Sequence, residues 1–332
     1  MRRRDFIAGI AATLTGLPHQ GRAQQSATVR RLAVLTASNE DDADARLNDE
    51  AFRTALSELG WIEGRNIQTE YRWAHGDRQR MHALAGELLA LRPDAFLAIT
   101  TAVTRAIREH SNTIPIVFVN VSDPIGDGFA QSLSRPGMNV TGFVNFEASV
   151  ATKWVQLLKE IAPATAQASI IINPVTAPGG GRYFSKPFED AALALGIKPT
   201  VAHVQTEAEI EAAMAAAASQ QSGALVVPPG GAFTRIHRNV IIGRARHYKL
   251  PAVYPERYFV RAGGLFSYGP NYPRLFGQAA SYVDRVLKGA PPGDLPIQLP
   301  SKFELSVNLK AAAAQGLAIS PLFLAQADEV IE

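Results

Sequence analysis

Short apolar runs and amphipathic segments alternate along most of this chain. A short apolar run suits a buried parallel strand, and apolar residues at helical spacing indicate the crossover helix that must follow it. The first half has strands expected at 31–37, 66–73, 94–99 and 115–120, with helices at 46–59, 78–91 and 102–110. Strands joined by right-handed helical crossovers predict a doubly wound sheet.

A second series of the same kind starts after a helix expected at 148–161. Its strands are expected at 168–173, 199–204, 224–227 and 252–254, separated by helices near 186–195, 207–220 and 234–248. The two halves share this architecture without a residue-level repeat. The expected fold class is therefore α/β, with two doubly wound Rossmann-like lobes, a hinge and an interlobe ligand cleft.

The C-terminal part is too short for a third domain. It supplies a run at 264–269, a helix at 274–287, a strand at 302–308 and a short helix at 309–315. We expect the chain to cross between the lobes near 142–145, 260–263 and 292–300, which would make a hinge that absorbs closure around a ligand. The expected first lobe is 30–142 plus 262–290, and the expected second lobe is 143–261 plus 299–332.

The start of the chain indicates export. Arg3 and Arg4 begin an R-R-x-F pattern, a mild apolar stretch covers 7–17, and a small-x-small site ends at Ala23. This is typical of a twin-arginine signal peptide at 1–23, cleaved after Ala23 and followed by a linker at 24–29. The apolar stretch is far shorter than the roughly 20 residues of a membrane-spanning helix. The prediction is a periplasmic protein, and the alternative is an arginine-rich first helix of a cytosolic protein.

Charge and cysteine content exclude several partners and chemistries. The chain has 33 basic and 30 acidic residues, but four arginines and one aspartate lie in 1–23, so the mature protein is formally neutral. No basic run is interleaved with aromatic residues, and nucleic acid is not an expected partner. Because the chain has no cysteine, disulfides, thiolate catalysis and cysteine zinc sites are excluded.

The motifs of common catalytic and cofactor sites are also missing. The sequence contains no G-x-S-x-G, no H-E-x-x-H, no P-loop and no G-x-G-x-x-G after the first strand. The glycine-rich stretches 179–181 and 228–231 fit ordinary turns better than a phosphate site. The acidic run at 40–44 fits a solvated helix N-terminus better than a cation site. We expect no catalytic residue, no metal and no cofactor.

Small polar and aromatic groups gather where the strands end. Ligands of open α/β sheets lie outside the carboxyl ends of the strands, so both lobes are expected to point these groups at one cleft. Hydroxyl, amide, carboxylate and tyrosine side chains suit a small polar or aromatic solute. The expected ligand-binding residues are Ser38, Thr100, Thr101, Ser122, Asp123, Asn173, Pro229, Gly230, Tyr254, Glu256 and Tyr268.

Several longer motifs make the chain resemble a known family. They are G-W-I-E-G-R-N-I at 60–67, E-Y-R-W-A at 70–74, I-P-I-V-F at 114–118 with the following Asp123-Pro124, L-S-R-P-G-M-N-V-T-G at 133–142, G-G-L-F-S-Y-G at 263–269, K-F-E-L-S-V-N-L-K at 302–310 and A-D-E-V-I-E at 327–332. Together they resemble the ABC-transporter substrate-binding proteins of the periplasmic-binding protein type I (Venus flytrap) fold, in the branch with tryptophan- and tyrosine-binding members. The resemblance covers nearly the whole chain. It implies a protein that closes on a solute and delivers it to an ABC permease in the membrane, without catalysing a reaction.

The departures from the family pattern fall near the expected cleft. Many members look more like Gly-Thr or Gly-Gly where this chain has Thr100-Thr101, and like N-P-x-N where it has 173–176. An aromatic amino acid is one candidate solute. Its carboxylate would contact Thr100, Thr101 or Ser122, its ammonium Asp123 or Glu256, and its ring Tyr254 or Tyr268.

Two other functions would use the same cleft. An exported enzyme would need a pair of carboxylates across it, and Asp123 with Glu256 is the pair that the sequence offers. A sensory binding protein would hand its signal to a membrane receptor rather than to a permease. For all three functions we expect a monomer.

Overall fold

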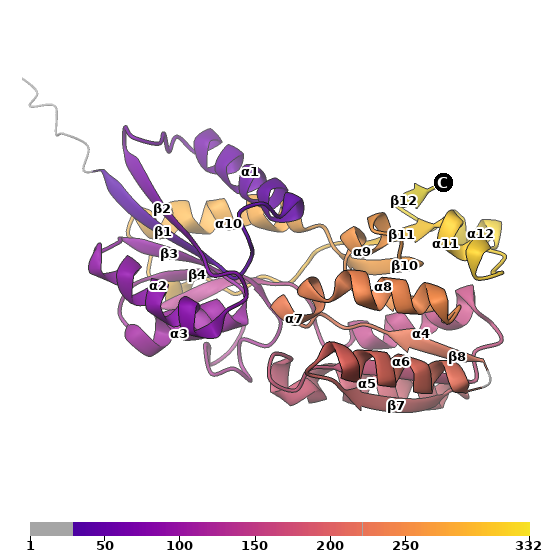
Figure 1. The fold of residues 1–332 in the computed structure, drawn as a ribbon. Helices are drawn as coiled ribbons and strands as arrows, with labels where there is room; N and C mark the ends of the chain where they lie inside the picture. Colours follow the sequence, from indigo (N-terminus) through magenta and orange to yellow (C-terminus); the bar gives the residue numbers. More distant parts are fainter. Residues whose placement is uncertain (1–28, 221) are drawn as a thin grey trace, which may run out of the picture.

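The chain folds into two α/β lobes that lie side by side, as the computed structural model shows in Figure 1. The structure describes residues 29–220 and 222–332. Each lobe is built on its own sheet of mostly parallel strands, which confirms the expected fold class. The expected signal peptide at 1–23 lies outside the described residues. Within the described residues, no helix is long and apolar enough to cross a membrane.

The first lobe contains a five-stranded sheet in the order β2-β1-β3-β4-β5. Its parallel strands are β1 (Arg30–Thr36), β2 (Ile67–Trp73), β3 (Ala95–Ile99), β4 (Ile116–Val121) and β5 (Val140–Val144). The sequence predicted a crossing between the lobes at 142–145 and no strand there, but residues 140–144 form β5. Its five residues are all buried and pair with β4 before the chain leaves the lobe.

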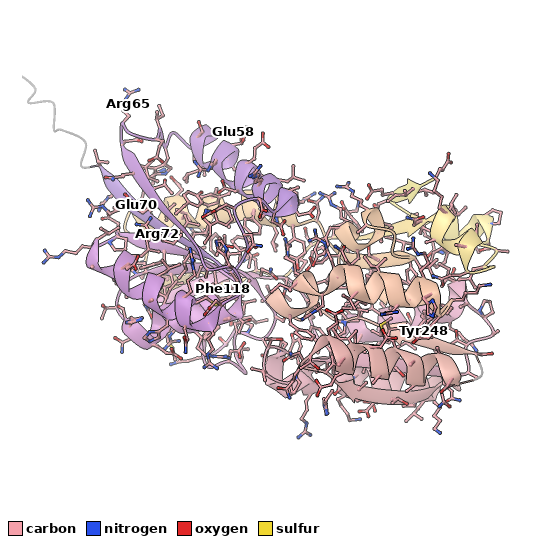
Figure 2. The ribbon with its side chains drawn as sticks, viewed as in Figure 1. Glu58, Arg65, Glu70, Arg72, Phe118 and Tyr248 are labelled. Atoms are coloured by element: carbon pink, nitrogen blue, oxygen red, sulfur yellow. The ribbon has the colours of Figure 1, made fainter. Side chains whose placement is uncertain are left out.

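Helices cover both faces of this sheet (Figure 1). One face carries α1 (Ala43–Glu58) and α10 (Tyr272–Leu287), and the other carries α2 (Arg78–Ala90) and α3 (Thr101–His110). Phe118 of β4, labelled in Figure 2, is fully buried on the α2 and α3 side. Burial of such a side chain contributes about 1.5–3 kcal/mol. Because α10 comes from late in the sequence, the first lobe is assembled from separate chain segments.

The second lobe contains a seven-stranded sheet in the order β12-β11-β10-β9-β8-β6-β7. Its strands are β6 (Gln167–Ile172), β7 (Lys198–His203), β8 (Gly223–Val226), β9 (Ala252–Tyr254), β10 (Phe266–Pro270), β11 (Phe303–Asn308) and β12 (Glu329–Ile331). Neighbouring strands are parallel except for β10 and β11. The strands β6 to β9 therefore end at one edge, and their loops face the first lobe.

Helices also cover both faces of the second sheet. One face carries α4 (Val150–Ile161), α5 (Arg182–Ala194), α11 (Leu309–Ala314) and α12 (Pro321–Leu324), and the other carries α6 (Glu207–Ser219), α8 (Arg238–His247) and α9 (Arg257–Arg261). The single helix expected at 234–248 is instead α7 (Ala232–Ile236) and α8, which meet at His237. Tyr248, labelled in Figure 2, follows α8 and donates a 2.6 Å hydrogen bond to Glu211 of α6. Short 3-10 turns lie at η1 (Pro178–Gly181) and η2 (Pro292–Asp294).

The chain crosses between the lobes after β5, after β10 and between η2 and β11. The expected crossing at 260–263 is wrong, because Phe266–Pro270 pairs with β9 and β11 in the second sheet. Residues 266–270 therefore belong to the second lobe, although the sequence placed them in the first-lobe segment 262–290. Gly269 makes the pairing possible, since a Cβ atom there would lie 1.8 Å from the carbonyl oxygen of Pro255.

Candidate ligand-binding cleft

A cavity of about 490 Å³ lies between the two lobes. Its walls are the loops that follow β1, β2, β3 and β4 of the first lobe and β6, β8 and β9 of the second. Each of these loops lies at the carboxyl end of a parallel strand, where open α/β sheets bind ligands. The volume is within the range of small-molecule pockets, so one small solute fits between the lobes.

The first-lobe wall consists mainly of hydroxyl, amide and carboxylate groups. Ser38 and Asp42 follow β1, Thr100 and Thr101 follow β3, and Asn120 lies near the end of β4. The φ angle is 97° at Thr100 and 64° at Asn120, values that residues with side chains rarely adopt. Such strain costs on the order of 1–3 kcal/mol per residue and gathers at ligand sites.

The second-lobe wall is formed by the loop 228–231 and the helices that follow it. Gly230 fixes this loop, because its N–H donates to the hydroxyl of Thr234 and its carbonyl accepts from the hydroxyl of Thr176, both at 3.1 Å. These bonds position the start of α7, which carries Arg235 into the cleft. Arg238, the first residue of α8, lines the same wall.

Arg235 joins the lobes through an ion pair. Its Nη1 lies 2.7 Å from Oδ2 of Asp42, and its Nη2 lies 3.8 Å from Oε2 of Glu256. Its guanidinium lies over the ring of Tyr258, 4.7 Å from the centroid. Burial alone would lower the pKa of Arg235, but Tyr258, Glu256 and Asp42 outweigh burial and raise it. Arg235 is therefore a fixed positive charge between two carboxylates.

The two carboxylates respond to this environment in opposite ways. Burial raises the pKa of Asp42, but Arg235, the backbone N–H of Ala45 and Arg238 together lower it below its ordinary value. Glu256 lies deeper, and burial raises its pKa above the ordinary value in spite of Arg235 and a hydrogen bond from Tyr272. Asp42 is thus held as a carboxylate, whereas Glu256 gains a proton more readily than an exposed glutamate.

Hydrogen bonds connect the cleft to the chain crossings. Tyr272, just after β10, donates to Oε1 of Glu256 at 2.9 Å and lies 3.3 Å from Oδ1 of Asn120. Asn145, just after β5, donates to Asn120 and accepts from the hydroxyl of Ser122 at 2.8 Å. The floor of the cleft is therefore also the hinge, and the hydroxyl of Ser122 is already used there.

A small recess borders the cleft inside the first lobe. Its volume is about 30 Å³, and Ser38, Asn120 and Arg235 line both the recess and the cleft. Its other walls include Tyr71, Trp73 and Phe276. At this size the recess holds one or two water molecules. It places aromatic surface directly behind the polar wall.

Six of the residues expected from the sequence line the cavity. They come from both lobes, as the strand-end rule predicts. These residues are Ser38, Thr100, Thr101, Ser122, Pro229 and Glu256.

Two further expected residues serve turns and are absent from the cavity lining. Oδ1 of Asp123 accepts a 2.8 Å hydrogen bond from the backbone N–H of Gly126. Oδ1 of Asn173 accepts one of 2.9 Å from the N–H of Val175. Asn173 thus forms an Asx turn, and Asp123 caps the turn that follows it, so both side chains stabilise the loop backbone. The carboxylate pair of Asp123 with Glu256 is therefore not assembled across the cleft.

The two tyrosines expected to stack on a ligand belong to the protein core. Tyr254 is 1% exposed and stacks on Phe259, with 5.0 Å between ring centroids. Tyr268 stacks on Phe303 at 5.4 Å. Gly230, expected as a direct ligand contact, is likewise absent from the lining and acts by fixing its loop. The expected stacking of Tyr254 and Tyr268 on a ligand is wrong, because both rings pack inside the second lobe.

Several cavity residues were missed by the strand-end rule. Asp42 does cap α1, with Oδ1 accepting from the N–H of Ala45 at 2.9 Å, but its other oxygen pairs with Arg235. Arg235 and Arg238 lie three residues apart directly after the loop 228–231, which is a signal that the sequence offers. Among the described residues, no group of three or more His, Cys, Asp or Glu side chains could hold a metal ion.

Comparison with known proteins decides the family. A family model described as "ABC transporter substrate binding protein" matches residues 33–331. The chain belongs to this family. Its members are extracytoplasmic binding proteins that bind small-molecule solutes and work with ABC permeases, and they are not enzymes. This confirms the resemblance seen in the sequence motifs.

Individual relatives agree with the family. The tyrosine-binding protein of Clostridioides difficile is 25% identical over 281 residues, covering 84% of this chain and 80% of that protein. The structure of a conserved domain protein from Vibrio cholerae has a TM-score of 0.83 and 26% identity, covering 91% of this chain and 100% of that one. A Streptococcus pneumonia structure in complex with L-Trp has a TM-score of 0.84 and 22% identity, covering 92% and 100%. The last likeness shows the fold alone.

Proposed function

We propose that this protein is the exported solute-binding component of an ABC uptake transporter. It closes its lobes on a small polar or aromatic solute, such as an amino acid or aromatic acid, and delivers it to a membrane permease. The observation that carries this proposal is the cleft of about 490 Å³, to which strand ends of both lobes contribute polar side chains. The R-R-x-F start and the site ending at Ala23 support export to the periplasm.

The cleft chemistry supports a solute that carries charge. Carboxylates from both lobes and two guanidinium groups from the second lobe line the cavity, and hydroxyl groups of Ser38, Thr100 and Thr101 add neutral donors and acceptors. Tyr258 is the tyrosine that lines the cavity, whereas the recess, at about 30 Å³, is too small for a ring. Tyr258 therefore takes the place of Tyr254 and Tyr268 in the proposal. The names of two relatives, one tyrosine-binding and one in complex with L-Trp, agree with this solute class.

Thermal unfolding of residues 24–332 against a solute panel tests the binding function. The panel contains amino acids, aromatic acids, sugars, nucleosides and small peptides. A solute that binds only the folded protein raises its melting temperature in a saturable way. We expect such a shift for one chemical class. If no member of the panel gives a shift, binding of a small solute is contradicted.

An uptake assay distinguishes a transport function from a sensory one. Cells that lack this chain are compared with cells that carry it, using the radiolabelled form of the solute identified by thermal unfolding. We expect uptake at low solute concentration to require the chain, and uptake that is equal in both strains would contradict the permease partnership.

Twin-arginine export is tested by a variant in which Arg3 and Arg4 are both replaced by lysine, which removes the R-R pair.

A further inference from the structure

Arg238 is the charged cleft residue with unused hydrogen-bond donors. Its Nη1 approaches Oδ2 of Asp42 only to 3.9 Å, and that oxygen is already held by Arg235 at 2.7 Å. Among the described residues, the Arg238 guanidinium makes no hydrogen bond. By contrast, Asp42, Arg235 and Glu256 all have close partners. One planar guanidinium with free donors therefore faces the cavity.

The helix start and a neighbouring tyrosine ring position Arg238. It begins α8 directly after the short helix α7, whose start is held by the bonds of Gly230. Its guanidinium lies 5.7 Å from the ring centroid of Tyr258, beside the more deeply seated Arg235. The side chain of Arg238 is 34% exposed, against 19% for Arg235. Arg238 thus lies beside the Tyr258 ring and lines the cavity while a third of its side chain stays exposed.

The chemistry of this group selects one class of ligand. A guanidinium presents paired N–H donors that match the two oxygens of a carboxylate. A doubly charged group would be repelled by Asp42, 3.9 Å from Arg238, and by the exposed Asp41 on the same wall. A neutral solute would leave Arg238 with only Asp42 as a charged partner, at 3.9 Å and beyond hydrogen-bond distance. A singly charged carboxylate fits this site best.

We propose that Arg238 binds the carboxylate of the solute, and that the solutes of this cleft are monocarboxylates. This inference rests on the proposed solute-binding function and goes beyond it by naming the anion-binding residue. It replaces Ser122 as the expected carboxylate contact, because the Ser122 hydroxyl donates to Asn145. Since Arg238 lies in the second lobe and Thr100 and Thr101 lie in the first, a bound carboxylate solute would link the lobes.

The test uses pairs of compounds that differ only in this charge. Calorimetric titration of residues 24–332 compares L-tyrosine with L-tyrosinamide, L-tryptophan with L-tryptophanamide and benzoate with benzamide, at a pH where the amines stay protonated. D-galactose is included as a neutral solute. The variants are R238A, R238K and the control R246A, which removes an exposed arginine from the other end of α8.

We expect the carboxylate member of at least one pair to bind more tightly than its amide. In R238A its Kd should rise roughly 10- to 100-fold, because charge-assisted hydrogen bonds are lost. The Kd of the amide should stay unchanged, R238K should recover part of the affinity, and R246A should behave as wild type. An unchanged melting temperature of R238A shows that the fold is intact.

The outcomes separate this inference from the proposed function. If a carboxylate and its amide bind equally well, or if R238A keeps the carboxylate preference, the role of Arg238 is overturned while solute binding stands. Tight binding of D-galactose alone would also overturn the monocarboxylate class and leave the binding function in place. If no compound of the titration or of the larger thermal panel binds, the proposed function fails and this inference fails with it.

Discussion

Nη1 of Arg235 lies 2.7 Å from Oδ2 of Asp42, and the two residues belong to different lobes, 193 positions apart in the sequence. Asp42 caps α1 in the first lobe, and Arg235 lies on α7 in the second. The side chains of Asp42 and Arg235 are 11% and 19% exposed. Removing one partner of a pair this shielded from water costs more than breaking a surface salt bridge, because the other charge is left without its partner. The ion pair therefore favours the arrangement in which the lobes are close together.

The variant D42N tests this role of the ion pair. Asparagine is as good a helix cap as aspartate, so α1 keeps its cap while the charge is lost. We expect the free energy of unfolding to fall by about 1–2 kcal/mol. We also expect small-angle X-ray scattering of the ligand-free protein to give a larger radius of gyration, because the lobes separate more readily.

The matched control for D42N is D77N. Asp77 caps α2 through hydrogen bonds to the N–H groups of Gln79 and Arg80, and it is not among the residues that line the cavity. D77N should leave the radius of gyration at the wild-type value. A scattering curve of D42N that superimposes on that of wild type would show that the ion pair does not hold the lobes together.

Glu256 makes the stability of the folded protein depend on pH, and the direction of this dependence follows from its pKa. Burial raises its pKa above the ordinary value of 4.5, so the folded protein holds this proton more tightly than the unfolded chain does. Its contribution to stability is therefore present below about pH 4.5 and is lost as the pH rises through the folded pKa. In E256Q this contribution is absent, because glutamine does not titrate. We expect wild type to lose stability relative to E256Q as the pH rises from about 4.5 towards neutrality.

Chemical unfolding of both proteins at a series of pH values measures this difference. Glutamine keeps an oxygen that accepts from the hydroxyl of Tyr272, so the hinge contact of 2.9 Å can persist. A stability difference that stays constant across the series would contradict the raised pKa of Glu256. A difference of the opposite slope would mean that the charge of Arg235 outweighs burial.

We predict that the backbone of Thr100 is strained. Its φ of 97° falls in a region that suits glycine. Replacing Thr100 by glycine should remove about 1–3 kcal/mol of strain and cost about 0.5–1 kcal/mol in chain entropy. We expect T100G to raise the midpoint of urea unfolding.

The neighbouring residue provides the control for T100G. Thr101 is the first residue of α3 and also lines the cleft. T101G should lower stability by up to about 1 kcal/mol, because glycine disfavours a helix. If both variants lower the midpoint equally, the backbone of Thr100 is not strained.

The sequence predicted those parts of the molecule that follow local rules. Apolar runs located the strands, and the carboxyl ends of parallel strands located Ser38, Thr100 and Glu256 at one cavity. These predictions succeed because strand direction alone decides on which side of a sheet a loop lies. The family resemblance came from motifs spread over the whole chain, and therefore did not depend on any single cleft residue.

Side-chain direction and long-range pairing could not be predicted in this way. Tyr254 lies two residues before Glu256, yet its ring packs against Phe259 inside the lobe while Glu256 faces the cleft. The pair of Asp42 with Arg235 depends on how two separately folded lobes meet. Neither is set by local spacing, because both depend on packing between distant segments of the chain.

Gly142 tests the strand that the sequence did not predict. It lies in β5 opposite Phe118, with a φ of 153°, and a Cβ atom there would lie 2.1 Å from the carbonyl oxygen of Phe118. G142A should therefore lower the free energy of unfolding by about 2–4 kcal/mol, because β4 and β5 must separate. The control G243A places the same methyl group in α8, where nothing lies within 4 Å, and should raise stability by up to about 1 kcal/mol. Urea unfolding of both variants measures the contrast, and a G142A protein as stable as wild type would mean that β5 does not pair with β4 at this register.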